Sequence, residues 1–372
     1  MMVMKVINVI NIGYVIPYFF GDQFDYLKNN GGIKSYVACK NDNDFIFYNK
    51  KYNLDSVTLP INRKLSLIDD LKCVFKLYRF IKKEKIDIIV GHTPKGGYIS
   101  VLTGLLVRKK VIYVRHGLVH ETASGLVRLI FIAIEKINSS LSSKTICVSP
   151  SVKNVSLDLK LGKKHKNIIL NKGTFNGIDT AYKFNPNRLS PTNGSYLSFG
   201  FIGRFAKDKG LIELIDAWRK INLDYPNCKL IIAGYQDERD PIPNEYLNII
   251  EKNSINISYL GKIKDQNFFY SKINVLILPS YREGFPTVVL EASSLKKAII
   301  TTKVTGCVDS IIENKTGLFC NTNSDSIQNS IQFFVNNPAK VVEFGENGRN
   351  FVVENFDEKI LWNNFIKILK DE

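Results

Sequence analysis

Residues 275–294 read VLILPSYREGFPTVVLEASS. The four apolar residues Val275–Leu278 are typical of a buried strand. A short polar loop follows, and we expect a helix over Thr287–Ser294 because Pro286 suits a first helical turn. A buried strand followed at once by a helix is the building unit of a parallel sheet with helical crossovers.

The same alternation continues on both sides of this stretch. In the second half of the chain we expect strands at Leu197–Ile202, Lys229–Ala233, Ile257–Leu260, Val275–Leu278 and Ala298–Thr302, with helices at Leu211–Asn222, Gln266–Ser271 and Thr287–Ser294. In the first half we expect strands at Val3–Ile12, Ile33–Cys39, Ile86–Gly91, Lys110–Arg115 and Thr145–Ser149, with the clearest helices at Ser66–Lys83 and Gly125–Asn138. The sequence therefore predicts an α/β protein with two Rossmann-like, doubly wound domains.

A Pro-, Asn- and Ser-rich segment without periodicity, Phe184–Ser195, separates the two halves. We therefore expect a first domain over residues 1–185, a linker at 186–196 and a second domain over 197–355. The C-terminal helix, within 356–372, is expected to pack back on the first domain. Ligands bind at the carboxyl ends of strands in such sheets, so the expected site is a cleft between two facing domains.

The composition narrows the class of protein. No run of about 18 uninterrupted apolar residues occurs, so we expect no transmembrane helix. The apolar start, Met1–Phe20, contains Asn8, Asn11 and Pro17 and lacks a small-residue cleavage site, which favours a buried strand over a signal peptide. The six cysteines show no metal-ligand or redox spacing and are expected to be buried in a reducing, cytoplasmic environment.

The charge is unevenly distributed. Residues 1–190 carry 30 Lys and Arg against 13 Asp and Glu, whereas the remainder carries 21 against 22. This asymmetry indicates a polyanionic partner for the first domain: a nucleic acid, an anionic membrane leaflet or a lipid-linked pyrophosphate. Signatures of RNA-binding domains and zinc fingers are absent, so no nucleic-acid partner is expected.

One helix of the first domain combines basic and apolar residues in a way that is typical of membrane-surface helices. Its basic residues are Lys72, Lys76, Arg79, Lys82, Lys83 and Lys85, and its apolar residues include Leu71, Val74, Phe75 and Leu77. We expect docking on an anionic membrane. The alternative is a helix whose apolar stripe belongs to the core and whose lysines are simply solvated.

Two carboxylates stand eight positions apart in the opening stretch, Glu283 in the loop and Glu291 in the helix. The amides of Thr287 and Val288, in the first helical turn, are free to receive a phosphate. Glu283 is placed to accept hydrogen bonds from sugar hydroxyls. A solvated helix face is the alternative interpretation of two glutamates at this spacing.

A second candidate site follows the first strand of the second domain. Within the run FIGRFAKDKG, residues 201–210, Arg204 offers a planar fork for phosphate oxygens and Lys209 a compact charge, while Lys207 fits an ordinary basic loop. Together with a helix dipole, the two cations would stabilise a departing diphosphate without a metal. An ordinary basic loop remains the alternative.

Three further features lie in the first half of the chain. His116, at the end of a predicted strand, is a candidate for hydrogen bonding to a ligand hydroxyl, although a packed loop histidine also fits. His120 lies four residues on, but no glutamate-based zinc motif accompanies the pair. Asn176–Asp179 reads as a turn, and Asp42-Asn43-Asp44 as a solvated loop in preference to a metal-binding acidic pair.

These residues resemble those of the GT4 glycosyltransferases of the GT-B fold, which are retaining and metal-independent. The likeness covers nearly the whole chain. It implies that Glu283, with Gly284, Phe285 and Pro286, contacts the donor sugar, that Glu291 contacts the ribose, and that Arg204 and Lys209, with Thr287 and Val288, bind the pyrophosphate. His116 is similar to the family's first-domain histidine that contacts the donor sugar, and Asn176–Asp179 to the turn that closes the first domain. Many members carry a Gly-Gly pair in the first loop, where this chain has Asn11–Tyr14 and then Phe20-Gly21.

The run Leu278–Glu291 followed by Thr305-Gly306-Cys307 is similar to bacterial enzymes that build O-antigens, capsules and glycan–lipid intermediates. The resemblance thus implies transfer of a hexose or N-acetylhexosamine, of the N-acetylgalactosamine type, from a UDP-sugar to an undecaprenyl-pyrophosphate-linked saccharide. Glu283 and His116 would be the catalytic residues, with no metal or other cofactor, at the inner face of the plasma membrane. Two alternatives remain: a UDP-sugar 2-epimerase of the same fold and a non-catalytic sugar-nucleotide-binding subunit.

Overall fold

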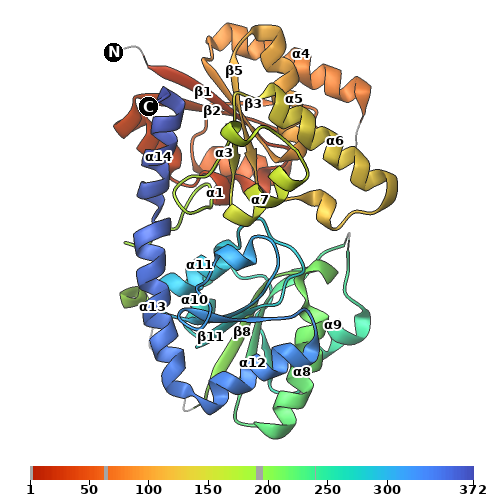
Figure 1. The fold of residues 1–372 in the computed structure, drawn as a ribbon, viewed down its shortest axis with the longest axis vertical. Coiled ribbons are helices and arrows are strands. Elements are labelled where there is room, and N and C mark those ends of the chain that lie inside the picture. Colours follow the sequence, from red (N-terminus) through yellow and green to blue (C-terminus); the bar gives the residue numbers. More distant parts are fainter. Residues whose placement is uncertain (1–2, 63–65, 190–195, 239) are drawn as a thin grey trace. The chain divides into compact units, whose positions relative to one another are not determined.

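The computed structural model describes residues 3–62, 66–189, 196–238 and 240–372 (Figure 1). Internal contacts divide the chain into two units. The first comprises Met1–Gly177 and Lys359–Glu372, and the second comprises Ile178–Glu358. Throughout the described ranges, every helix is too short or too polar to cross a lipid bilayer.

The first unit is built on a parallel sheet whose described strands follow the order β3-β2-β1-β4-β5-β6-β7. The strands are β1 Met4–Val9, β2 Ile33–Cys39, β3 Ser56–Thr58, β4 Ile88–His92, β5 Lys110–Arg115, β6 Lys144–Cys147 and β7 Asn167–Ile168. The helices are α1 Ile16–Phe19, α2 Gln23–Tyr26, α3 Asn43–Lys51, α4 Leu67–Glu84, α5 Thr93–Val107, α6 Gly125–Leu141, α7 Pro150–Asp158 and α14 Glu358–Lys370.

The second unit repeats the plan with the described strand order β10-β9-β8-β11-β12-β13, again parallel. The strands are β8 Ser198–Phe205, β9 Lys229–Gln236, β10 Ile257–Tyr259, β11 Val275–Leu278, β12 Ala298–Thr302 and β13 Gly317–Cys320. The helices are α8 Leu211–Asp224, α9 Asn244–Glu251, α10 Gln266–Tyr270, α11 Thr287–Ser294, α12 Ser324–Asn336 and α13 Pro338–Phe356. The prediction of two Rossmann-like, doubly wound sheets is confirmed.

Helices cover both faces of the second sheet. A core around Trp218 of α8 and Phe334 of α12 fills one side, and a core around Leu290 of α11 and Val352 of α13 fills the other. Burial on both faces explains why these strands read as continuous apolar runs in the sequence.

The expected strand Val3–Ile12 is shorter in the structure, because β1 ends at Val9 and a 3-10 turn occupies Gly13–Val15. The expected strand Thr145–Ser149 likewise ends at Cys147, since Ser149 caps α7 by accepting a hydrogen bond from the Val152 amide. The short strands β3, β7 and β13 were not predicted from the sequence.

The boundary between the units falls earlier than the expected linker at 186–196. The segment that begins at Ile178 packs into the core of the second unit through Ile178, Phe184 and Leu189. Residues 190–195, which form most of that expected linker, lie outside the described residues.

Helix α14 returns to the first unit. The Trp362 ring lies 5.1 Å from that of Tyr26, and its Nε1 donates a hydrogen bond of 2.9 Å to Asn176. Phe365 packs edge-on against Phe175, with ring centroids 5.0 Å apart. The chain therefore ends in the unit where it began.

Candidate functional site

The loop between β11 and α11 holds Glu283 in a fixed position. Its Oε1 accepts hydrogen bonds from Ser280 Oγ at 2.9 Å and from Lys209 Nζ at 2.6 Å. The backbone of Ser280 is itself held by Thr302 Oγ1 of the neighbouring strand β12. Glu283 and Lys209, 74 positions apart in the sequence, thus form an ion pair in which both side chains are mostly buried.

Two glycines make this approach of loops possible. Gly210, with φ +67°, ends the turn that carries Lys209, and a Cβ there would lie 2.1 Å from the Pro279 carbonyl oxygen. Gly306, with φ +82°, would place a Cβ 2.6 Å from the carbonyl oxygens of Glu283 and Gly284. Because both positions combine a left-handed φ with backbone contact, they require glycine.

Arg204 lies at the carboxyl end of β8, and its Nη1 forms an ion pair with Asp237, which directly follows β9. Strands β8 and β9 are paired in register up to Phe205 and Gln236, and the Asp237 amide donates to the Phe205 carbonyl. The Asp237 carboxylate is nearly buried, whereas about a third of the Arg204 side chain is exposed. The pair orients the guanidinium and leaves part of it open to solvent.

Helix α11 begins at Thr287, with Pro286 as the residue before it. Pro286 has no side-chain oxygen to cap the helix, so the first amides, those of Thr287 and Val288, have neither a cap nor an intrahelical carbonyl partner. Within the same loop, the Phe285 ring packs on Phe356, with centroids 5.2 Å apart. Phe285 therefore anchors the loop through its ring.

Glu291 is buried inside the second unit. Its Oε2 accepts a 2.7 Å hydrogen bond from Tyr270 OH, which also donates to the Val288 carbonyl. Burial raises the pKa of the Glu291 carboxyl above its ordinary value, while the charge of Lys183 and the Tyr270 hydrogen bond act in the opposite direction. Glu291 is thus a buried carboxylate, and the solvated helix face considered as an alternative does not describe it.

His116 follows β5 and belongs to the first unit. Its Nε2 lies 2.9 Å from Nδ1 of His92, at the end of β4, and its half-buried ring stacks on Phe19 with centroids 3.7 Å apart. Burial lowers the pKa of His116 to about 3, so the imidazole is neutral at physiological pH. His120, in contrast, is fully buried in the turn after it.

The remaining candidates have structural roles. Asp42 caps α3 through a 2.8 Å bond from the Phe45 amide and accepts a 3.1 Å bond from the Gly13 amide. A Cβ at Gly13 would lie 2.1 Å from the Phe45 nitrogen, so this loop needs a glycine although it lacks the Gly-Gly pair. Asn176–Asp179 spans the boundary between the units. Among the described residues, no three His, Cys, Asp or Glu side chains cluster as metal ligands.

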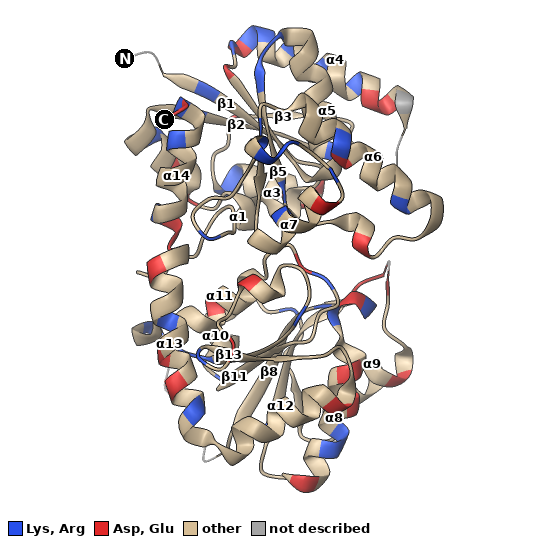
Figure 2. Cartoon of the chain, viewed as in Figure 1, with Lys and Arg blue, Asp and Glu red and all other residues tan. Residues whose placement is uncertain are grey.

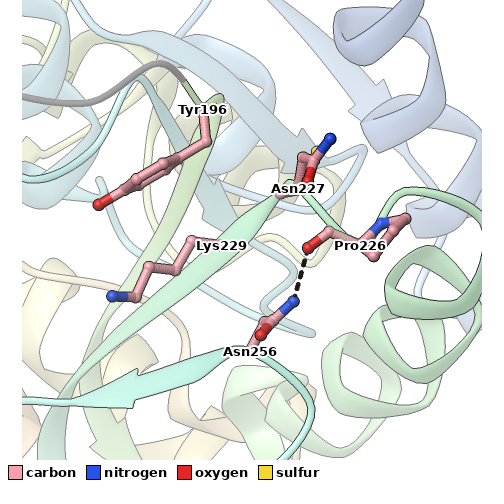
Figure 3. Close-up of a pocket in the computed structure, with 6 residues that line it drawn as sticks. Tyr196, Pro226, Asn227, Lys229 and Asn256 are labelled. Atoms are coloured by element: carbon pink, nitrogen blue, oxygen red, sulfur yellow. Dashed lines mark hydrogen bonds between the residues drawn. The ribbon is translucent and has the colours of Figure 1, made fainter.

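A cavity of about 440 Å³ in the second unit is lined by Tyr196, Asn227, Lys229 and Asn256, among others (Figure 3). Lys229 begins β9, and Asn256 directly precedes β10. The cavity therefore lies at the amino ends of the strands, whereas Arg204, Asp237 and Glu283 lie at or after carboxyl ends. Ligands of open parallel sheets bind at the carboxyl ends, which separates this cavity from the candidate site.

Several residues around the candidate site were not predicted from the sequence. Asp237 is the ion-pair partner of Arg204. It directly follows β9, which lies next to β8, and its place at the end of a predicted strand could have identified it. Ser280 and Tyr270 position the two glutamates through hydrogen bonds that no local spacing encodes. His92, on the neighbouring strand β4, contacts His116, and Asn8 on β1 contacts His92 in turn.

Two family models match the chain in succession. Residues 25–171 match Glycosyltransferase Family 4, and residues 188–351 match Glycosyl transferases group 1. Together they span most of both units.

Individual glycosyltransferases are also similar to this chain over most of its length. The chain is 27% identical to the capsular polysaccharide biosynthesis glycosyltransferase CapM of Staphylococcus aureus, over 96% of this chain and 94% of CapM. It is 24% identical to the UDP-Gal:alpha-D-GlcNAc-diphosphoundecaprenol alpha-1,3-galactosyltransferase of Escherichia coli, over 79% and 78% of the two chains.

The crystal structure of Anabaena HepE in complex with UDP-glucose superposes with a TM-score of 0.81 at 16% identity, covering 99% of this chain and all of HepE. At this identity the likeness establishes the fold. The two family matches, together with relatives of bacterial capsule and O-antigen synthesis, show that the chain belongs to the family 4 glycosyltransferases, and the superposition agrees with their GT-B fold.

Proposed function

We propose that this glycosyltransferase is a retaining, metal-independent enzyme. It transfers a hexose or N-acetylhexosamine, with N-acetylgalactosamine the first candidate, from a UDP-sugar to an undecaprenyl-pyrophosphate-linked saccharide in cell-surface polysaccharide synthesis. The observation that carries the proposal is the Lys209–Glu283 ion pair, formed between two loops at the carboxyl edge of the second sheet. The relatives support the substrate classes: the E. coli enzyme is named for a UDP-galactose donor and a diphosphoundecaprenol-linked acceptor.

Each part of the donor has a proposed partner. Arg204, Lys209 and the amides of Thr287 and Val288 bind the diphosphate, because they supply two cations and the positive end of a helix dipole. Glu283, with Gly284, Phe285 and Pro286, contacts the donor sugar, and Glu291 contacts the ribose. His116 accepts a hydrogen bond from the donor sugar.

The chemistry follows from these roles. As the bond between the anomeric carbon and the diphosphate breaks, negative charge develops on the leaving oxygen, and the fixed cations stabilise it. The sugar passes through an oxocarbenium-like state, and the acceptor hydroxyl attacks from the face that the diphosphate leaves. We assign no side chain as a nucleophile. The Glu283 carboxylate, held by Ser280 and Lys209, orients the sugar while this happens.

Two rival functions are weaker. A UDP-sugar 2-epimerase requires acid and base groups at C2 of the sugar, and the carboxylates that surround the proposed diphosphate site are engaged in ion pairs with Lys209 and Arg204. A non-catalytic nucleotide-sugar-binding subunit would use the same donor contacts, but both family models that match the chain describe glycosyltransferases.

A donor screen tests the proposal. The enzyme is incubated with UDP- and GDP-sugars in EDTA, with and without a lipid-linked saccharide, and nucleotide release is measured. We expect acceptor-dependent release of UDP from one sugar, unchanged by EDTA because the cations replace a metal. Complete loss in EDTA that Mg²⁺ or Mn²⁺ restores would contradict metal independence, conversion of the sugar without acceptor would indicate an epimerase, and binding without turnover a non-catalytic subunit.

We further propose that the first unit docks on the anionic inner face of the plasma membrane, which would place the enzyme in the cytoplasm as a peripheral protein. Helix α4 divides its apolar residues between core and surface. Val74 and Leu77 are buried, whereas Leu71 and Phe75 are 59% and 62% exposed. The exposed pair lies one helical turn apart, beside Lys72, Lys76 and Arg79. Figure 2 shows several stretches of α4 in the colour of Lys and Arg.

A second helix of the first unit, α6, also exposes apolar residues. Helix α5 packs against both α4 and α6, so the three lie side by side. The first two turns of α6 expose four large apolar residues: Leu126, Val127, Leu129 and Ile130. An apolar surface of this kind beside lysines fits the boundary between headgroups and acyl chains of an anionic bilayer.

A further inference from the structure

Three polar side chains form a chain of hydrogen bonds that leads from the centre of the first sheet to His116. Asn8 Oδ1, in β1, lies 3.1 Å from His92 Nε2, and His92 Nδ1 lies 2.9 Å from His116 Nε2. Asn8 and His92 are buried, while His116 is half-buried. Strands β1, β4 and β5 are adjacent in the sheet, so the backbone fixes the spacing of all three residues.

The orientation of the Asn8 amide determines which nitrogen of His92 carries the proton. Its Nδ2 faces the carbonyl oxygen of Tyr36 on β2, 3.5 Å away. The reverse orientation would place two oxygens against each other, so Oδ1 must face His92. Because an amide oxygen only accepts, the proton of neutral His92 resides on Nε2, and His92 Nδ1 carries a lone pair.

The position of the proton on His92 determines the position of the proton on His116. His92 Nδ1 accepts, so His116 Nε2 must donate, and the remaining nitrogen of a neutral His116, Nδ1, carries the lone pair. Burial, and to a lesser degree His116 itself, lowers the pKa of His92 well below its ordinary value. The rings of Phe19, Phe20 and Phe175 pack around the two imidazoles, and His116 is the titratable group that bears on His92.

We propose that Asn8 and His92 are positioning residues that hold His116 as its Nε2–H tautomer, so that Nδ1 presents a fixed hydrogen-bond acceptor to one hydroxyl group of the donor sugar. This inference rests on the proposed function of His116 as a sugar contact. Within the described part of the chain, His116 Nδ1 forms no hydrogen bond, whereas Nε2 is engaged. Stacking on Phe19 fixes the plane of the ring and hence the direction of the lone pair.

The tautomer has a consequence for specificity. An uncharged imidazole that only accepts has no attraction for the diphosphate, which leaves that group to the cations of the second unit. It favours a sugar with a hydroxyl at the matching carbon over the corresponding deoxy or fluoro sugar, since neither of these can donate a proton to Nδ1.

The tautomer itself is measured without substrate. Long-range ¹H–¹⁵N correlation spectra of the full chain labelled with ¹⁵N-histidine resolve which nitrogen of each imidazole is protonated, and single His→Gln variants assign the four histidines. We expect His92 and His116 both to carry the proton on Nε2 and to stay neutral down to the lowest pH at which the protein remains folded. A proton on Nδ1 of His116 would overturn the inference.

Variants of His92 test the function of this chain of hydrogen bonds. His92→Leu removes the acceptor for His116 Nε2–H, and we expect a donor KM about tenfold higher, which corresponds to the loss of one oriented hydrogen bond. His92→Asn keeps an acceptor oxygen near the former Nδ1 and should recover most of this loss. In a His116→Ala background, His92→Leu should have no further effect on KM, because the positioning acts through His116.

The outcomes separate this inference from the proposed function. An equal tenfold rise in donor KM from His92→Leu with and without His116 would show a merely structural role of His92 and contradict its positioning of His116. Thermal unfolding of each variant shows whether it is folded, and the spectra of the wild type decide the tautomer even if His92→Leu does not fold. Absence of any nucleotide-sugar turnover in the wild type would instead contradict the proposed function and leave the measured tautomer unaffected.

Discussion

Replacing Lys209 or Arg204 with alanine is expected to lower turnover at saturating donor by about two orders of magnitude each, as for the loss of one donor at a developing anion. Both side chains are held by carboxylates, Glu283 and Asp237, and are therefore oriented before the donor binds. Cations that are fixed in advance stabilise the departing diphosphate without reorganisation in the transition state. The measurement is kcat from acceptor-dependent UDP release.

Lys207 provides a matched control, because it lies in the same 3-10 turn as Lys209 and its side chain is exposed. Lys207→Ala removes one positive charge from the same turn and should change kcat by less than a factor of about three. Near-normal turnover of Lys209→Ala or Arg204→Ala, with intact thermal unfolding, would refute the assignment of that residue to the diphosphate. An equal loss of kcat in Lys207→Ala would show that the effect depends only on the net charge of the turn.

Removing the basic face of α4 is expected to weaken binding to anionic vesicles by two to three orders of magnitude. The variant changes Lys76, Arg79, Lys82 and Lys83 to Gln, all exposed in the structure. Each basic residue near an anionic surface contributes on the order of 1 kcal/mol, and about 1.4 kcal/mol corresponds to a factor of ten. Co-sedimentation with phosphatidylglycerol vesicles measures the partition, which should fall as salt rises.

A second variant with the same charge loss controls for net charge. Lys28, Lys160, Lys163 and Lys164 are exposed residues of the first unit outside α4, and their change to Gln should leave most of the binding intact. A third variant, Leu71→Ser with Phe75→Ser, removes the exposed apolar pair and should weaken binding without changing its dependence on salt. Equal sedimentation with neutral and anionic vesicles, or none with either, would contradict membrane docking.

The fold was largely predictable because its strands are buried on both faces. The run Val275–Leu278 has the bounds expected from the sequence, since continuous apolar residues flanked by helices leave few other solutions. The returning C-terminal helix was expected from its position after the last strand, but its attachment through Trp362 and Asn176 was not. Contacts between distant segments produce no periodic pattern of residues in the sequence, so they could not be predicted from it.

The site was predictable only where one loop carries its chemistry. Glu283 and Thr287 belong to a single strand–loop–helix unit, and Arg204 and Lys209 to another, so the order of residue types along each unit was enough to single them out as candidates. Their roles stay predictions. The partners Asp237, Ser280, His92 and Asn8 come from neighbouring strands and appear only when the sheet order is known. The burial of Glu291 depends on Tyr270 of α10, which no spacing along α11 reveals.

The anomeric configuration of the product tests the central proposal most directly. The enzyme is supplied with the UDP-α-sugar that it accepts in the donor screen and with a soluble analogue of the lipid-linked saccharide, and the new glycosidic bond is examined by ¹H NMR during the first turnovers. A diphosphate that leaves from the face that the acceptor attacks, stabilised by Arg204 and Lys209 without a nucleophilic side chain, predicts an α-linked product. A β-linked product would contradict the account.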